Sequence, residues 1–297
     1  MADFIKPKRR HVVMYLALPV ALFLFAVIAP LFEAFYFSFF KWSGGPNKTF
    51  TGLANYAVLL GDRLFWQAFS HNIFLVAACV VGQIGLAFVF VMVINAKAVK
   101  FKDLHSTLTF FPSTISAVAI GMVWRIIFDY RYGLLNHLFG ALGMSDMQKI
   151  WLNEASSIMV VVAIPLIWQY IGYYMIILLS AITTIDKEIY EVAELDGAGP
   201  VKRAVHITLP LIKNTILVCL TLCIAGNMKA FDHIYVMTSG GPGSSSNVMA
   251  MYGYITSFVQ SNMGYGSTIS MGIFMLSLSI IGVTQFGVNK LTKEAAQ

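Results

Sequence analysis

Charged side chains are scarce in this sequence. Asp, Glu, Lys and Arg make up 11% of its 297 residues, whereas roughly 25% is ordinary for a globular chain. Apolar residues make up 58%. This balance argues against a soluble enzyme, a disordered chain and a nucleic-acid-binding protein, although the formal net charge is +6. In so apolar a chain, surplus Lys and Arg are typical of cytosolic loops that face anionic lipid.

Metal-binding and phosphate-binding patterns are missing as well. The three cysteines, Cys79, Cys219 and Cys223, lie in apolar runs and have neither disulfide nor zinc spacing, so we interpret them as small buried residues. The six histidines show no metal spacing. No G-x-x-x-x-G-K-[ST] motif occurs, and such a motif would supply the backbone cradle and lysine that hold nucleotide phosphates. We therefore expect neither a metal site nor an ATP site on this chain.

Long stretches without charge predict helices that cross a membrane. A helix needs roughly 20 apolar residues to cross about 30 Å of hydrocarbon, and a backbone in lipid must satisfy its own hydrogen bonds. The sequence therefore predicts an all-α integral membrane protein with six transmembrane helices. The predicted spans are about 12–40, 69–94, 104–128, 156–182, 211–236 and 267–288. After the glycine-rich stretch 240–246, residues 248–259 are predicted to form a shorter, interfacial helix.

Basic residues predict the orientation of these spans. With the N-terminus inside, thirteen Lys and Arg fall in cytosolic segments and five fall outside, and the positive-inside rule then places both termini in the cytosol. The thirteen are Lys6, Lys8, Arg9, Arg10, Lys97, Lys100, Lys102, Lys187, Lys202, Arg203, Lys213, Lys290 and Lys293. The cytosolic parts are then a tail at 1–10, the loop 183–210 and a tail at 291–297.

The loop 183–210 is the one cytosolic segment long enough to carry a function of its own. Asp186 suits the N-cap of a helix, and acidic residues in the following turns favour the helix dipole. Gly197 suits the left-handed position that ends a helix, and Pro200 suits the first turn of the next one. The loop is thus predicted to form a helix–turn–helix elbow on the inner face of the membrane. A solvated connecting loop is the alternative.

A motif in this loop resembles a known family. The pattern Glu191-Val192-Ala193-x3-Gly197-x9-Ile207-x-Leu209-Pro210 resembles the EAA loop of ABC importer permeases, with Val192 where the family usually has a second alanine. The resemblance extends along most of the chain and is to the maltose-type, binding-protein-dependent permeases for carbohydrate uptake. The further segments that carry it are Phe50–Tyr56, Phe111-Pro112, Gly133–Asn136, Trp168-Gln169 with Gly172, and Phe231–Pro242. The last of these is typical of the first permease of a heterodimeric pair.

The resemblance implies a type I ABC importer permease fold and a place in a larger assembly. A solute-binding protein delivers a sugar to the outer face, and two different permease chains form the path across a bacterial plasma membrane. Two cytosolic ATPase subunits bind ATP and magnesium, so this chain needs no cofactor and no metal of its own. The elbow is then the coupling helix that enters a cleft of the ATPase. The residues assigned to this coupling are Glu191, Ala193, Asp196, Gly197 and Ala198.

Polar and aromatic residues at mid-depth are the candidates for the substrate path. Sugars are recognised by hydrogen bonds and by stacking on aromatic rings, and polar groups facing lipid are costly. The candidates are Trp168, Gln169, Gly172 and Tyr173 on the fourth span, and Asn227 on the fifth. By resemblance, Tyr173 and Asn227 match positions that line the maltose-type sugar site. Other positions of that site differ here, which argues against maltose itself: Leu166, Gln169, Tyr170, Cys223 and Ala230. Packing between permease helices is the alternative role.

Two other functions compete with a permease. A secondary transporter working alone on an ion gradient would need membrane-embedded acids, and only Glu33 and Asp232 approach that requirement. We also expect Asp232 to form an ion pair with Lys229 near the outer end of the fifth span. An intramembrane hydrolase would need a buried nucleophile with its base or paired acids, and no such set falls at matching depth. The sequence favours the importer permease.

Overall fold

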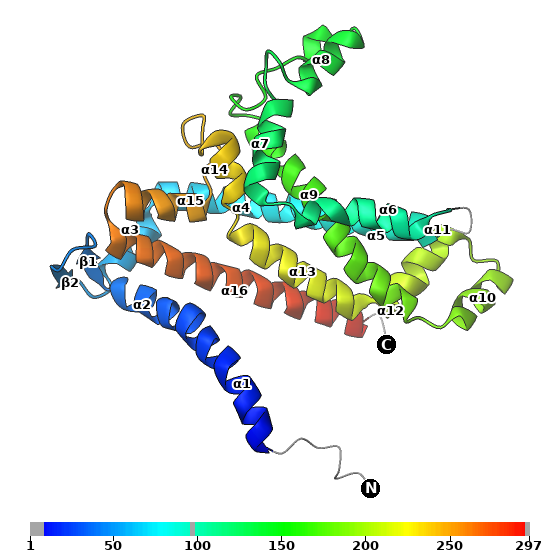
Figure 1. Ribbon diagram of the computed structural model, residues 1–297, viewed down its shortest axis with the longest axis horizontal. Coiled ribbons are helices and arrows are strands. Elements are labelled where there is room, and N and C mark those ends of the chain that lie inside the picture. The colour runs from blue at the N-terminus through cyan, green and yellow to red at the C-terminus, as the bar shows by residue number, and fades with distance from the viewer. Residues whose placement is uncertain (1–8, 96–98, 295–297) are drawn as a thin grey trace. The chain divides into compact units, whose positions relative to one another are not determined.

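The computed structural model describes residues 9–95 and 99–294 (Figure 1). Most of the predicted N-terminal tail, including Lys6 and Lys8, lies outside the described residues, as do Lys97 and the last three residues of the chain. The described chain divides into two compact units. One holds the residues up to Asp62 together with Gly253–Gly272, and the other holds Arg63–Tyr252 and the residues from Ile273 onward.

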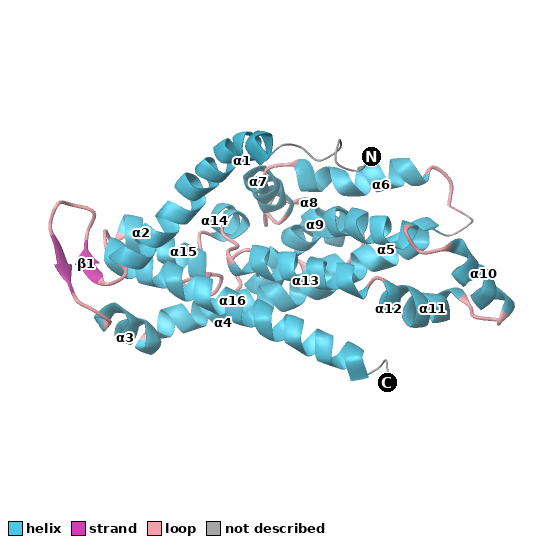
Figure 2. Ribbon diagram, turned by 90° about the horizontal axis from the view of Figure 1, so that it is seen from below, coloured by secondary structure: helices cyan, strands magenta, loops and turns pink. Residues whose placement is uncertain are grey.

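The first unit combines a long apolar helix with a short β-hairpin. The helix consists of α1 (Arg9–Phe23), a π-helical turn (Leu24–Ile28) and α2 (Ala29–Phe37). Strands β1 (Phe40–Trp42) and β2 (Lys48–Phe50) follow and pair antiparallel, and Figure 2 shows them as the magenta arrows. The helix ends before the predicted boundary at residue 40, because Phe40 enters the hairpin and faces Phe50 across it.

Buried Ser38 organises the end of this helix. Its carbonyl oxygen accepts hydrogen bonds from Asn55 Nδ2 at 2.8 Å and from Thr268 Oγ1 at 3.1 Å. Its hydroxyl lies 2.7 Å from that of Tyr56. Asn55 and Tyr56 belong to α3 (Ala54–Gly61), which follows the hairpin. Two residues of the family-like segment 50–56 therefore hold the C-terminal end of the first helix.

The second unit is a bundle of apolar helices around α9 (Ile158–Thr183). The segment Arg63–Asn95 is one apolar helix made of α4 (Arg63–Cys79), a π-helical turn (Val80–Gly85) and α5 (Leu86–Asn95). It packs against α9 and against α13 (Lys213–Met228), with buried Cys79, Met175 and Cys219 among the residues of the shared core. The last helix, α16 (Met263–Glu294), is longer at both ends than the predicted span 267–288.

The third predicted span is bent, and another bend lies at the start of the fifth. The third consists of α6 (Lys102–Phe110), a 3-10 turn (Phe111–Thr114) and α7 (Ala117–Ile127), with an angle of 98° between its halves. Before the fifth, the chain from Pro200 to Leu211 meets α13 at 77°. Pro112 and Pro210 lie at these bends. A helix bends there because proline lacks a backbone N–H donor and disfavours helical geometry in the residue before it. By length and composition, four helices could cross a membrane, or up to six if each bent pair is one span.

The fifth predicted span, 211–236, is not one continuous helix. Helix α13 ends at Met228, and α14 (Asp232–Thr238) begins four residues later. The intervening Phe231 has φ −144° and ψ −57°, outside the helical region. The predicted ion pair between Lys229 and Asp232 is also wrong, since no salt bridge joins these two described residues; both side chains are exposed. Downstream, α15 (Met249–Tyr254) and a π-helical turn (Ile255–Val259) occupy the predicted interfacial helix.

Candidate functional site

The loop 183–210 forms two helices joined by a tight turn. Helix α10 (Lys187–Leu195) starts at Asp186, whose carboxylate accepts a hydrogen bond from the Glu188 N–H at 3.1 Å. Asp196 ends the helix, and Gly197 follows with φ +75°. The Gly197 N–H donates to the Glu194 carbonyl at 3.1 Å, which is a pattern typical of a glycine-terminated helix. A side chain at Gly197 would strain this backbone even though the space around it is open.

Three contacts hold together the two halves of the elbow and the turn between them. Helix α11 (Pro200–Arg203) begins with a proline, and Arg203 Nη1 lies 3.1 Å from Glu194 Oε2. The Ala198 N–H donates to the Ala193 carbonyl at 2.9 Å, and Ala193 is itself buried. Farther along, the Tyr190 hydroxyl lies 3.0 Å from Thr208 Oγ1. The elbow therefore holds its own shape, with Ala193 in its interior and Ala198 partly exposed.

The outer face of the elbow is apolar and uncovered by this chain. Leu195 is 89% exposed and Val201 is 77% exposed, and Val192 also lies open. Glu191 is exposed beside them. In Figure 1 this elbow lies at the far end of α9 from α8 (Leu134–Ala141). Large aliphatic side chains left this open around a glycine turn are a feature of surfaces that bind other proteins.

A cavity of about 500 Å³ lies where α9 approaches the break between α13 and α14. Its lining residues are Gln83, Ala117, Leu166, Tyr170, Tyr173, Tyr174, Leu222, Gly226, Asn227, Lys229, Ala230, Phe231, Asp232 and His233. Aromatic rings, amides and two charged side chains therefore line the same cavity. A larger and more open hollow, about 700 Å³, lies between the end of α9 and the start of α13, but its lining is aliphatic and small polar residues. The smaller cavity has the groups that recognise a hydroxylated ligand.

Only two of the five predicted path residues line this cavity. Tyr173 and Asn227 do so. Trp168 lies outside the lining, 43% exposed, with its ring edge-on to Trp124 at 5.9 Å. Gly172 marks a helix crossing, because a Cβ there would collide with the carbonyl of Thr109 on α6.

Gln169, the remaining path residue, is buried and fully engaged. Its Nε2 donates to the Ile115 carbonyl at 2.9 Å, and its Oε1 lies 2.7 Å from His233 Nε2. Ile115 is in the bend of the third span, and His233 follows the break in the fifth. Gln169 therefore joins the two discontinuous spans instead of facing the cavity.

Sequence reasoning missed three buried polar residues near the cavity. Gln83 Nε2 donates to the Leu166 carbonyl at 2.9 Å, and Gln83 also lines the cavity with His233. The amide of Asn72 is completely buried and bonds to the end of α13. Asn72 and Gln83 are amides inside the apolar segment Arg63–Asn95, and an amide at that depth was the available signal, because an unpaired amide in lipid is costly.

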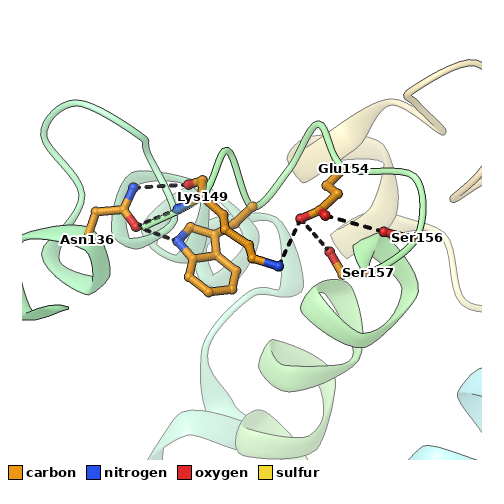
Figure 3. A network of polar contacts seen from close by, with 6 residues as sticks. Asn136, Lys149, Glu154, Ser156 and Ser157 are labelled. Carbon is orange, nitrogen blue, oxygen red and sulfur yellow. Dashed lines mark hydrogen bonds and ion pairs between the residues drawn. The ribbon is translucent and has the colours of Figure 1, made fainter. Parts of the chain in front are cut away.

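The segment between α7 and α9 is organised by a buried asparagine (Figure 3). Asn136 Oδ1 accepts from Trp151 Nε1 at 2.8 Å, and its Nδ2 donates to the Lys149 carbonyl at 3.0 Å. Lys149 Nζ lies 3.6 Å from Glu154 Oε2, which also accepts a hydrogen bond from Ser157 Oγ. This network explains why the family-like segment 133–136 ends in asparagine.

A tight turn opens the same segment. Asp129 Oδ1 accepts the N–H groups of Tyr132 at 2.8 Å and of Arg131 at 2.9 Å, and these bonds lower the pKa of the Asp129 carboxyl. The backbone of Gly133 lies so close to the Asp129 carbonyl that any side chain there would collide with it. Among the described residues, no group of three His, Cys, Asp or Glu side chains could hold a metal ion.

The sequence matches one protein-family model, "Binding-protein-dependent transport system inner membrane component", over residues 96–288. It is 34% identical to the probable ABC transporter permease protein YurN of Bacillus subtilis, over 92% of this chain and 94% of that protein. It is 28% identical to the sulfoquinovosyl glycerol transport system permease protein SmoG of Agrobacterium fabrum, over 92% of this chain and 89% of that one.

A solved structure has the same fold. It is a bacterial ABC transporter involved in the import of the acidic polysaccharide alginate; a chain of that structure superposes with a TM-score of 0.81 at 19% identity, covering 98% of both chains. The predicted family and the predicted all-α permease fold are confirmed. This chain belongs to the family of binding-protein-dependent transport system inner membrane components and is a membrane-spanning permease subunit of an ABC transporter.

Proposed function

We propose that this permease moves a sugar or oligosaccharide into the cytoplasm across a bacterial plasma membrane. The observation that carries the proposal is the cavity beside the broken fifth span. Tyr170, Tyr173 and Phe231 supply aromatic surfaces, and Asn227 supplies an amide, which are the groups that bind CH faces and hydroxyls of sugars. We assign sugar contact to Tyr173 and Asn227. Trp168, Gln169 and Gly172 serve packing and positioning.

The names of related proteins support a sugar substrate. SmoG serves sulfoquinovosyl glycerol, MsmF of Streptococcus mutans belongs to a multiple sugar-binding transport system, and NgcF of Streptomyces coelicolor belongs to a diacetylchitobiose uptake system. Another solved chain of this fold comes from an alginate transporter in complex with its alginate-bound periplasmic protein. These substrates differ in charge and length but share a hydroxylated ring.

The proposed assembly has partners on both sides of the membrane. An extracytoplasmic solute-binding protein delivers the sugar, and a second, different permease subunit completes the route. Two cytosolic ATPase subunits bind ATP and magnesium and hydrolyse the ATP, so this chain is not itself an enzyme. The coupling elbow meets an ATPase through Leu195, Val192 and Glu191, and both termini lie in the cytosol. Apolar side chains around a glycine turn suit a cleft in the partner.

The test is uptake by a reconstituted transporter. The chain would be co-expressed with the second permease and the ATPase encoded beside it, purified, and placed in vesicles with the matching binding protein. A sugar identified by its binding to that binding protein is the probe. We expect uptake only with ATP on the ATPase side and with the binding protein outside. Uptake that needs no ATP and collapses with an ionophore would instead establish a stand-alone secondary transporter.

A further inference from the structure

The break in the fifth span leaves backbone groups without helical partners. Helix α13 ends at Met228 and α14 begins at Asp232. Carbonyl groups in the last turn of a helix have no N–H donor inside it, and burying them unbonded is costly. Neither proline nor glycine lies between Met228 and Asp232, so the local sequence does not explain why helix α13 ends there.

The Asn227 carbonyl accepts the Ala230 N–H at 3.3 Å, and the side chain of Asn72 bonds to two of these groups. Its Nδ2 donates to the Asn227 carbonyl at 2.8 Å and to the Met228 carbonyl at 3.2 Å. Its Oδ1 accepts the Met249 N–H, at the start of α15, at 2.9 Å. All three partners are main-chain groups, and the Asn72 side chain is completely buried. One amide from α4 therefore caps the end of α13 and the beginning of α15 together.

The residues next to these bonds form the cavity wall. Asn227 lines the cavity, and so do Lys229 and Phe231 in the break itself. The Asn227 side chain bonds back to the Cys223 carbonyl within α13 at 2.9 Å, so it does not bridge the break. Asn72 itself does not line the cavity. The carbonyls that it binds belong to Asn227 and Met228, and the lining residues Lys229 and Phe231 come directly after them in the chain.

We propose that Asn72 is a positioning residue for the substrate path: its amide holds the fifth span open at residues 229–231, so that Asn227, Lys229 and Phe231 face the cavity. That this cavity wall belongs to a sugar path rests on the proposed function. The effect of Asn72 on the shape of the wall does not. Leucine at position 72 would keep the number and branching of the side-chain heavy atoms, with bulkier methyl groups, and would remove every hydrogen bond. A protonated aspartic acid would keep one O–H donor and one acceptor, whereas the ionised carboxylate would oppose two carbonyl oxygens.

The first experiment compares wild type, N72D and N72L in reconstituted vesicles, with uptake normalised to the amount of assembled complex. We expect N72L to transport at least tenfold less at every pH, since it removes all three buried hydrogen bonds of residue 72 and the net loss of one or two is already that large. We expect N72D to approach wild type at low pH and to fall about tenfold as its carboxyl ionises at higher pH. The pH is changed on one preparation, so folding and assembly are the same at both ends of the profile.

Other titratable groups near the break are common to all three proteins. They are His71, Tyr170, Tyr173, Tyr174, Cys223, Lys229, Asp232 and His233. Their effects therefore cancel when each variant is divided by wild type at the same pH. A ratio for N72D that does not change with pH would show that the hydrogen bonds of residue 72 do not govern transport, and it would overturn the proposal.

The second experiment measures the cavity wall without any substrate. A membrane-impermeant maleimide would label K229C, and the native Cys79, Cys219 and Cys223 are all buried, so background labelling is low. We expect N72L to slow labelling of K229C about tenfold, because the freed carbonyls draw the break toward helix. Y132C, at an 82% exposed position between α7 and α9 that is predicted to lie on the same side of the membrane as Lys229, is the matched control and should label at an unchanged rate. Equal K229C rates with and without N72L would overturn the proposal, whereas absent sugar uptake by wild type would overturn only the proposed function.

Discussion

His233 Nε2 lies 2.7 Å from Gln169 Oε1, and the same glutamine donates through Nε2 to the Ile115 carbonyl. This one side chain on α9 therefore joins the bend of the third span to the segment beyond the break of the fifth. Because Gln169 Nε2 is the donor to Ile115, its Oε1 accepts, and His233 must carry its proton on Nε2. Two discontinuous spans are held together by two hydrogen bonds of a single buried amide.

Gln169→Leu should destabilise the permease without blocking its synthesis. The change removes both hydrogen bonds and leaves buried groups of Ile115 and His233 without this partner, at a cost of roughly 1–3 kcal/mol for each group left unsatisfied. Thermal unfolding of the purified complex in detergent measures the loss. Trp168→Phe is the matched control, because Trp168 is the neighbouring residue and is 43% exposed. A Gln169→Leu protein as stable as this control would show that the two bonds contribute nothing.

The sequence predicted where the apolar helices lie far better than where they break. Hydrophobic length indicates a helix from the composition of about twenty residues, so 156–182 is close to the observed Ile158–Thr183. A break between Met228 and Asp232 depends on Asn72, which is 155 positions away from Asn227 in the sequence. Local helix propensity carries no information about such a distant contact. The predicted pair of Lys229 and Asp232 failed for the same reason, since it assumed an unbroken helix with both side chains on one face.

In the candidate site, too, the sequence predicted the structure well only where it depends on neighbouring residues in the chain. The elbow could be predicted closely, because Asp186, Gly197 and Pro200 act through their own backbone neighbours. Within the path, polarity at mid-depth did not separate a residue facing a cavity from one bonded to a neighbouring helix. Tyr173 and Gln169 lie one turn apart on α9, yet Tyr173 lines the cavity and Gln169 bonds away from it.

Tyr173→Ala and Asn227→Ala should each lower transport at limiting sugar. Each removes one stacking or hydrogen-bonding contact worth about 1 kcal/mol, which corresponds to roughly a fivefold loss. Uptake across a range of sugar concentrations, with co-purified ATPase measured alongside, provides the test. Trp168→Ala, outside the cavity lining, should leave the sugar dependence unchanged. If Tyr173→Ala or Asn227→Ala matched wild type throughout, that residue would belong to packing instead.

Gly172→Ala should act on assembly of the helices and not on sugar affinity. The added Cβ would meet the main chain at Thr109 and Phe110, which cannot give way as a flexible side chain can. We expect a lower yield of folded permease, by size-exclusion profile, and unchanged sugar dependence in whatever assembles. Gly226→Ala is the control on α13, where the added Cβ has open space. Equal yields from the two variants would argue against a tight crossing of α6 and α9.

Reporter fusions test the predicted orientation. A reporter active only in the cytosol should function when fused after Gly199, in the elbow, and should be silent when fused after Gly243, beyond α14. The physical reason is the bias of Lys and Arg toward the segments assigned to the cytosol. A reporter that requires export should give the reverse pattern at the same two positions. If both reporters contradicted the assignment, the elbow would face outward and could not meet a cytosolic ATPase.

Gly197→Leu should abolish transport while the chain still inserts in the membrane. The leucine would strain a backbone at φ +75° by roughly 1–2 kcal/mol and would fill open space that the ATPase is proposed to occupy. Gly199→Ser is the matched control, because Gly199 has φ −64°, also faces open space, and precedes a helix where serine is a favoured cap. Glu191→Ala should give a milder loss, since it removes one exposed carboxylate from the same face. Co-purification with the ATPase and vesicle uptake measure all three variants. The coupling role requires Gly197→Leu to lose both ATPase retention and uptake while Gly199→Ser keeps both, and full activity in Gly197→Leu would refute it.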